Sequence, residues 1–197
     1  MTIKDIPFNC SKHFREYPCS HRQWKHKGHC RYVHGYSRSF TFWFASNELD
    51  ENGFVVDFSS LRPLEKKLRE HFDHTFLVNF DDPLLETWKN LHSKEVLDLR
   101  VMNNVGMEST AQLVWGWAND LLFSRDKGRS CCLKTIAHEN DINSASYDSG
   151  RSGTASSCAE TSSTKRLICN LRSSRSIFTP NCFKAEVYSV ADSITTS

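Results

Sequence analysis

The chain has 197 residues, 39% of them hydrophobic, and a formal net charge of +2, which suffices for one domain with a core of its own. Its Lys and Arg residues are mostly mixed among Asp and Glu, which argues against nucleic acid or an acidic membrane surface as a partner. No stretch reaches the roughly 20 apolar residues of a membrane span, and the N-terminus lacks the apolar core of a secretory signal, so we expect a cytoplasmic protein.

Two strands are predicted in the first third of the chain. Residues 39–46, SFTFWFAS, alternate phenylalanines with other side chains, as a half-buried strand does. Residues 53–60, GFVVDFSS, follow a polar segment that ends in the turn-forming pair Asn-Gly. The two segments therefore predict a β-hairpin.

Helices and further strands follow the hairpin. Residues 59–72 open with two serines, carry Pro63 in the first turn and place leucines along one stripe, which predicts an amphipathic helix. The later predicted elements are a short helix over 83–92, a strand over 96–102, a second amphipathic helix over 109–123 and a strand over 130–139. Strands with helices set between them in this order favour an α+β fold, with the helices on one face of the sheet.

The composition changes at Ser149. From there to the end, 18 of 49 residues are Ser or Thr, too polar a mixture to offset the entropy of ordering. We expect one domain over residues 1–148 and a disordered tail over 149–197, which includes one apolar fragment, 176–190, suited to a short strand.

A cluster of histidines and cysteines precedes the first predicted strand. Its members within residues 13–34 are His13, Cys19, His21, His26, His29, Cys30 and His34. These residue types in one segment suit a catalytic zinc site that uses some of the histidines. They also suit a structural zinc module of Cys19, His21, His29 and Cys30, or a polar loop without metal.

Several short motifs in fixed order resemble one known family. HCRYVHGY (29–36) is followed by NGFVVDFSSLRPLEKKL (52–68) and then by FDHTFL (72–77). This order is similar to the 6-pyruvoyltetrahydropterin and 6-carboxytetrahydropterin synthases, in which a Cys precedes an HGH motif and an Asp-His pair closes the first helix. The resemblance implies the tunnelling fold: a four-stranded antiparallel sheet, two main helices on one face, and subunits joined into an oligomeric barrel with the site between them.

The same resemblance implies roles for individual residues. Cys30 would be the thiol that moves a proton on the substrate, tuned by Asp73 and His74. Glu139, in HENDINSASY, would anchor the pterin ring, because a carboxylate can accept two parallel hydrogen bonds. Thr110, in STAQ, matches the opening of the family's second helix and would lie at the substrate.

Zinc is the cofactor that the resemblance implies, with His13, His34 and Tyr36 as candidate ligands. The sequence departs from the family here in two ways. Phe8 and His13 stand one residue further apart than usual, which needs a bulge in the strand. Tyr36 replaces the second His of HGH, and a phenol with a pKa near 10 is a poor zinc ligand unless the metal removes its proton.

The implied activity is that of a zinc-dependent lyase on 7,8-dihydroneopterin triphosphate. The Cys-x₃-His spacing from Cys30 to His34 resembles the 6-carboxytetrahydropterin synthases of the 7-deazaguanine (queuosine) pathway. The basic segment 22–38 would suit the triphosphate. Alternatives are a pterin-binding homologue that has lost turnover, and the structural zinc module.

Overall fold

The computed structural model describes residues 6–148, so the predictions for residues 149–197 lie outside the described part. The elements in chain order are β1 (Phe8–His21), η2 (His29–Arg31), β2 (His34–Ser46), η3 (Phe58–Leu61), α1 (Arg62–Phe72), β3 (Thr75–Asn79), α2 (Leu85–Ser93), β4 (Leu99–Met102), α3 (Met107–Asp126), β5 (Ser130–His138) and β6 (Ser144–Asp148). None of the described helices has the length and apolar character needed to cross a membrane.

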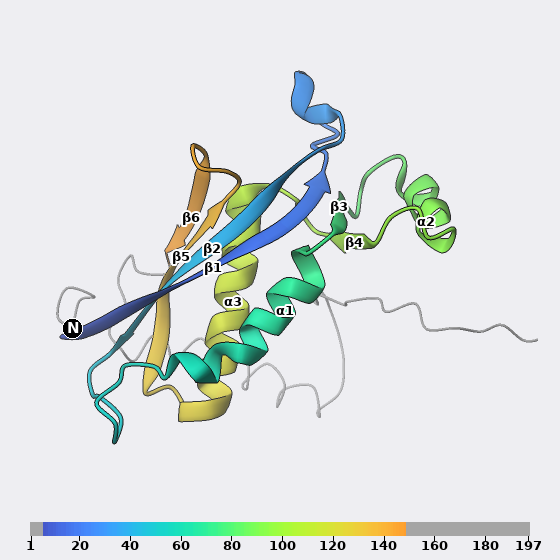
Figure 1. Ribbon diagram of the computed structural model, residues 1–197. Coiled ribbons are helices and arrows are strands. Elements are labelled where there is room, and N and C mark those ends of the chain that lie inside the picture. The colour runs from blue at the N-terminus through green and yellow to red at the C-terminus, as the bar shows by residue number, and fades with distance from the viewer. Residues whose placement is uncertain (1–5, 149–197) are drawn as a thin grey trace, which may run out of the picture.

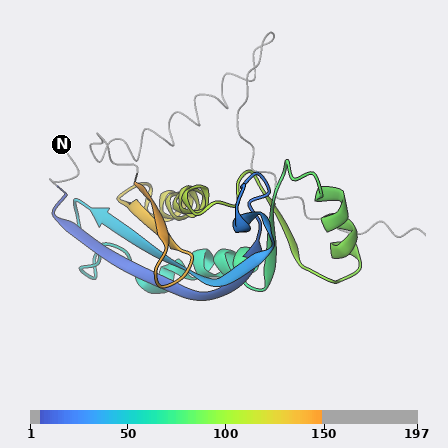
Figure 2. The same cartoon turned by 90° about the horizontal axis from the view of Figure 1, so that it is seen from above.

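The strands form one curled mixed sheet in the order β4-β3-β1-β2-β5-β6. Strands β1, β2, β5 and β6 pair antiparallel, whereas β3 runs parallel to both β1 and β4. Figure 1 shows α1 and α3 together on one face of the sheet, and Figure 2 shows the strands curving around that face. The α+β class is confirmed, but the predicted four-stranded antiparallel sheet is extended by two parallel strands.

The predicted hairpin is wrong, because β2 pairs with β1 and β5 rather than with residues 53–60. In that segment the neighbours Val55 and Val56 are both buried, so the side chains do not alternate as in a strand. The Asp57 side chain then accepts a hydrogen bond from the Ser59 backbone N–H at 2.8 Å and caps η3. The segment is therefore a lead-in to α1.

A bulge divides β1 into two halves with opposite side-chain parity. The pairing with β2 shifts between Phe14 and Tyr17, and Glu16 has a φ of 71°. Phe14 and Tyr17 are both buried in the core, although they are an odd number of residues apart. An inserted residue reverses the face of everything that follows, so His13 lies on the opposite face of the sheet from His21.

The core lies between the sheet and the two long helices. Phe40, Phe42 and Phe44 of β2 are fully buried, as are Leu68 and Phe72 of α1. The Phe40 and Phe72 rings lie 4.9 Å apart between centroids. The face of β2 that was predicted to be buried is therefore the one that α1 covers.

His71 gives the folded state a pH dependence. Its Nε2 is buried without a hydrogen-bond partner among the described residues, and burial, with repulsion from Arg100 and Lys67, lowers the pKa of His71 to about 4. In the unfolded chain His71 binds a proton near pH 6.5. The contribution of neutral His71 to the free energy of unfolding is therefore fully present above that pH and falls toward pH 4, by at most about 1.4 kcal/mol per pH unit.

We expect the free energy of unfolding to fall between pH 7 and pH 5, and to fall less in His71→Phe. Urea titrations at each pH measure this difference. The control is His26→Phe, which replaces an exposed histidine and should keep the wild-type pH dependence. Equal slopes for the two variants would show that His71 contributes nothing.

Candidate active site

Three polar side chains meet at one end of the sheet. His21 ends β1, His34 begins β2, and Glu139 follows β5. The two histidines are paired across the strands with ring centroids 4.4 Å apart, and His21 Nε2 lies 3.9 Å from Glu139 Oε1. Their possible ligand atoms all lie within 4.8 Å of one another. This arrangement is a candidate metal centre.

The structure does not bring His13 to this centre. His13 Nδ1 lies 2.8 Å from Thr41 Oγ1, and the same hydroxyl lies 3.0 Å from His138 Nε2, on the other face of the sheet. The bulge in β1 is the reason, because it reverses the faces of the strand and puts His21, not His13, on the side of His34. A signal in the sequence does exist: Tyr17 and His21 have the aromatic-x₃-His spacing, which Phe8 and His13 lack.

His34 has the orientation of a metal-ligating histidine. Its Nδ1 lies 2.7 Å from the Tyr32 carbonyl oxygen, and because a carbonyl only accepts, Nδ1 is the donor and Nε2 keeps its lone pair. Tyr36, two residues further along β2, is 43% exposed, and its ring centroid lies 6.1 Å from that of His34. Tyr36 therefore lies beside His34, and the described residues show no ring contact between Tyr36 and His21.

Arg38 lies behind His21 and is 1% exposed. Its Nη2 is 3.1 Å from His21 Nδ1, and its Nη1 is 3.3 Å from Thr110 Oγ1. Thr110 is itself fully buried in this chain, and its place at the substrate stays a prediction.

Cys30 lies in η2, in the connection between β1 and β2. Its thiol is free and half-buried, and its carbonyl accepts a hydrogen bond from the Gln23 N–H at 2.9 Å. The connection that contains Cys30 runs from His21, the last residue of β1, to His34, the first residue of β2.

The four residues of the alternative zinc module do not come together. Among the described residues, the one group suited to a metal is His21, His34 and Glu139.

Asp73 and His74 form a pair at the end of α1. His74 Nδ1 lies 2.6 Å from Asp73 Oδ1, and Arg69 donates to Asp73 Oδ2 at 2.8 Å. Partial burial raises the pKa of Asp73, but the hydrogen bonds from His74 and Arg69 outweigh it and lower the pKa. His74 has a φ of 58°, and its backbone N–H bonds to the Pro18 carbonyl. Within residues 6–148, no hydrogen bond or ion pair joins this pair to Cys30.

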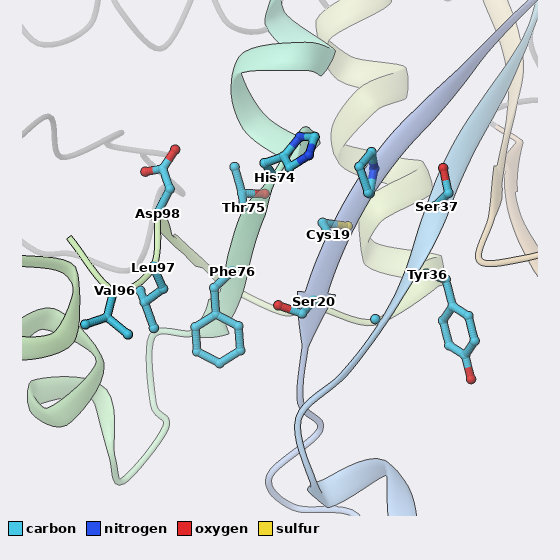
Figure 3. A pocket seen from close by; sticks show the side chains of 12 residues that line it. Cys19, Ser20, Tyr36, Ser37, His74, Thr75, Phe76, Val96, Leu97 and Asp98 are labelled. Carbon is cyan, nitrogen blue, oxygen red and sulfur yellow. The ribbon is translucent and has the colours of Figure 1, made fainter.

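A shallow groove of about 560 Å³ lies next to His74. Figure 3 shows residues of β1, β2 and β3 along it, with His74 at one side and the Tyr36 ring turned away at the other. The groove includes neither Cys30 nor the His21–His34–Glu139 group. Within one chain, His74 therefore lies at the groove, whereas Cys30, which was predicted to act with it, lies in the connection between β1 and β2.

The basic segment 22–38 is less open to an anion than its sequence indicates. Arg22 is held by Asp82 through two 2.8 Å hydrogen bonds, Lys25 pairs with Asp81, and Arg38 is buried. Lys27 and Arg31 are exposed and make no ion pair within the described part. These two are the cations of the segment that a phosphate can reach.

Comparison with known proteins gives a consistent picture. The family model described as 6-pyruvoyl tetrahydropterin synthase matches residues 9–150. The chain is 34% identical over 68 residues to a 6-carboxy-5,6,7,8-tetrahydropterin synthase of Rickettsia conorii, which is 34% of this chain and 49% of that protein. It is 33% identical over 78 residues to the synthase of the same name from Bacillus subtilis, 40% of this chain and 51% of that protein. The chain thus spans about half the length of the curated relatives it matches.

Two solved structures show the likeness in fold. An uncharacterized protein from Wolinella succinogenes superposes with a TM-score of 0.63 at 20% identity, over 72% of this chain and 98% of that one. The 6-pyruvoyl tetrahydropterin synthase of Plasmodium vivax superposes with a TM-score of 0.52 at 14% identity, over 73% and 99%. At such low identity, these matches support the architecture alone.

Proposed function

The chain belongs to the 6-pyruvoyl tetrahydropterin synthase family, whose model matches residues 9–150, and from this membership we propose that it is a pterin-synthase lyase of the 6-carboxytetrahydropterin type. Its substrate is 7,8-dihydroneopterin triphosphate, and its product serves the 7-deazaguanine (queuosine) pathway. The names of the curated relatives support this choice, as does the Cys30-x₃-His34 spacing. The observation that carries the proposal is the meeting of His21, His34 and Glu139 around the segment that contains Cys30.

Each residue has a chemical task in this proposal. The Glu139 carboxylate accepts hydrogen bonds from the amino-amide edge of the pterin and fixes the ring. The Cys30 thiolate removes a proton from the substrate side chain, and a thiolate needs a cation or hydrogen-bond donor beside it to form at neutral pH. Lys27 and Arg31 attract the triphosphate.

Zinc is the metal that the family resemblance implies, and bound zinc would polarise the oxygens of the substrate side chain as a Lewis acid. His34 fits it, because its Nε2 lone pair is free, and Glu139 fits as an oxygen donor. His21 fits less well, because its Nδ1 contacts the guanidinium of Arg38. The donor set therefore suits zinc in part.

The test is incubation of the full chain, with and without added zinc, with 7,8-dihydroneopterin triphosphate. We expect that the substrate and one water give tripolyphosphate, a product with the mass of 6-carboxytetrahydropterin, and the two remaining side-chain carbons as acetaldehyde. A 6-pyruvoyl product would move the chain to the other branch of the family. Binding of the pterin without triphosphate release would favour the non-catalytic homologue, an alternative supported by Tyr36 at the place of a family histidine.

Replacing Tyr36 by His should tighten zinc binding. Tyr36 lies beside His34 on β2, and an imidazole there supplies a nitrogen donor that a neutral phenol lacks. We expect about a tenfold lower zinc Kd, or roughly 1.4 kcal/mol, measured by competition with a chromophoric chelator. Tyr32→His, which replaces an exposed tyrosine of the preceding connection, is the control and should leave the Kd unchanged. An unchanged Kd for Tyr36→His would place residue 36 outside the metal's reach.

We further infer that the chain acts as a homo-oligomer in which a second copy supplies the Asp73–His74 pair to Cys30. In one chain His74 lines the groove, which does not include Cys30. If the site is shared, mixtures of Cys30→Ala and His74→Ala chains should regain turnover that neither variant shows alone, after unfolding and refolding together. Turnover that stays absent in the mixture, while wild-type chains recover under the same treatment, would contradict a shared site.

A further inference from the structure

The contact behind His21 has a defined polarity. Arg38 Nη2 lies 3.1 Å from His21 Nδ1, and the arginine is almost fully buried. A guanidinium has five N–H donors and no acceptor. Arg38 therefore donates this hydrogen bond, and His21 Nδ1 accepts it.

That polarity decides which ring nitrogen of His21 carries the proton. A neutral imidazole has one N–H and one acceptor nitrogen, so acceptance at Nδ1 leaves the hydrogen on Nε2. His21 is then neutral, because a doubly protonated imidazole has a donor at both nitrogens and could not accept the hydrogen bond from Arg38. The Nε2 atom lies 3.9 Å from Glu139 Oε1, which is beyond hydrogen-bond distance.

The two histidines of the candidate centre are thus oriented in opposite ways. A metal-ligating histidine almost always donates its second ring N–H to an acceptor, and His34 does so toward the Tyr32 carbonyl oxygen at 2.7 Å. His21 has a donor at the equivalent place. For His21 Nε2 to ligate a cation, the hydrogen bond from Arg38 must be lost or the ring must lose its last proton.

We propose that Arg38 is a positioning residue that holds His21 in its Nε2–H form, so that His21 does not ligate zinc. The inference rests on the proposed function only for zinc as the metal that the site would take. Zinc then keeps His34 and Glu139 as protein ligands, one fewer than the three usual in catalytic sites. The buried positive charge of Arg38 weakens cation binding further. Wild-type chain should therefore lose zinc on dialysis.

Long-range ¹H–¹⁵N spectra of the histidine rings give the first test. We expect His21, assigned by its absence in His21→Gln, to show the Nε2–H tautomer in the wild-type chain and His34 the Nδ1–H tautomer. On addition of zinc, the His34 resonances should shift first. A Nδ1–H tautomer for His21, or zinc on its Nε2 at one equivalent, would overturn the proposal.

Zinc affinity gives the second test. Arg38→Met keeps the length of the side chain but removes the donor and the charge, so His21 can take the other tautomer. We expect zinc binding at least tenfold tighter than in the wild type. The matched control is Arg15→Met, which removes the same charge from an exposed arginine of β1, and we expect a change below threefold.

The two tests separate this inference from the proposed function, since neither needs turnover. Equal zinc affinity in folded Arg38→Met and wild type would overturn it, as would a wild-type chain that keeps one zinc per chain through dialysis. If Arg38→Met does not fold, the wild-type spectra and dialysis decide alone. If the wild-type chain shows the expected tautomers but no lyase activity, the proposed function is contradicted and the role of Arg38 stands.

Discussion

Alanine at position 30 is expected to lower triphosphate release by about 10²- to 10⁴-fold, the usual contribution of a positioned acid or base. Cys30 is a free, half-buried thiol in the connection between His21 and His34. No other residue of that connection, residues 22–33, carries a sulfur that could act as a nucleophile or base. The measurement is the rate of triphosphate release at saturating substrate, with folding checked by thermal melting.

The control for this change is Cys10→Ala, which removes a half-buried thiol from the first half of β1 and should keep full turnover. Alkylation gives a second readout. Burial raises the pKa of both Cys10 and Cys19, so at neutral pH a smaller fraction of each is thiolate than in an ordinary cysteine. We therefore expect Cys30 to be labelled before these two. Full activity in Cys30→Ala would remove the thiol from the mechanism, whatever its labelling rate.

Replacing Glu139 by Gln should weaken binding of a phosphate-free pterin by about 10- to 150-fold, because hydrogen bonds to a charged group contribute about 1.5–3 kcal/mol. The amide that replaces the carboxylate has one acceptor and one donor group, so it cannot accept two parallel hydrogen bonds. A fluorescence titration with neopterin measures the affinity without involving the triphosphate or Cys30.

Asp141→Asn is the matched control, because it neutralises an exposed carboxylate in the turn just after Glu139 and should leave neopterin binding unchanged. Zinc affinity of Glu139→Gln separates two roles of the carboxylate. Lost pterin binding with an unchanged zinc Kd indicates an anchor for the ring. The reverse result, lost zinc with normal neopterin binding, would make Glu139 a metal ligand alone and contradict its proposed role as the anchor of the pterin ring.

Elements with a local signal were predictable. Helices α1 and α3 and strands β2 and β5 lie where their periodicity predicts them, because one apolar face at regular spacing belongs to the segment itself. Strand β3 is buried along its whole length, so its residues do not alternate and give no strand signal, and around Phe8 and His13 of β1 only the family resemblance implied a strand. Residues 53–60 show the converse error, since two valines followed by a capping Asp resemble the start of a strand.

The site residues likewise divide into those that the sequence predicts and those that it does not. The motif around HCRYVHGY identifies Cys30 and His34, and HENDINSASY identifies Glu139, because short motifs keep their spacing along the chain. The choice between His13 and His21 depended on the bulge at Glu16, a single residue with positive φ that reverses the faces of β1. Nothing in the residues around Glu16 requires the bulge; burial of both Phe14 and Tyr17 in one core does.

The sequence by itself thus determined the family, the α+β class, the main helices and three of the side chains proposed for the chemistry, because periodicity and motif spacing are properties of neighbouring residues. Tertiary structure alone decided that Thr110 lies under Arg38 and that Arg38 directs a donor at His21, and it brought His21 rather than His13 to His34, for which the sequence holds only the spacing from Tyr17 to His21. These contacts join residues up to 72 positions apart. Their geometry depends on strand register and on how the sheet packs against α3, which no local pattern contains.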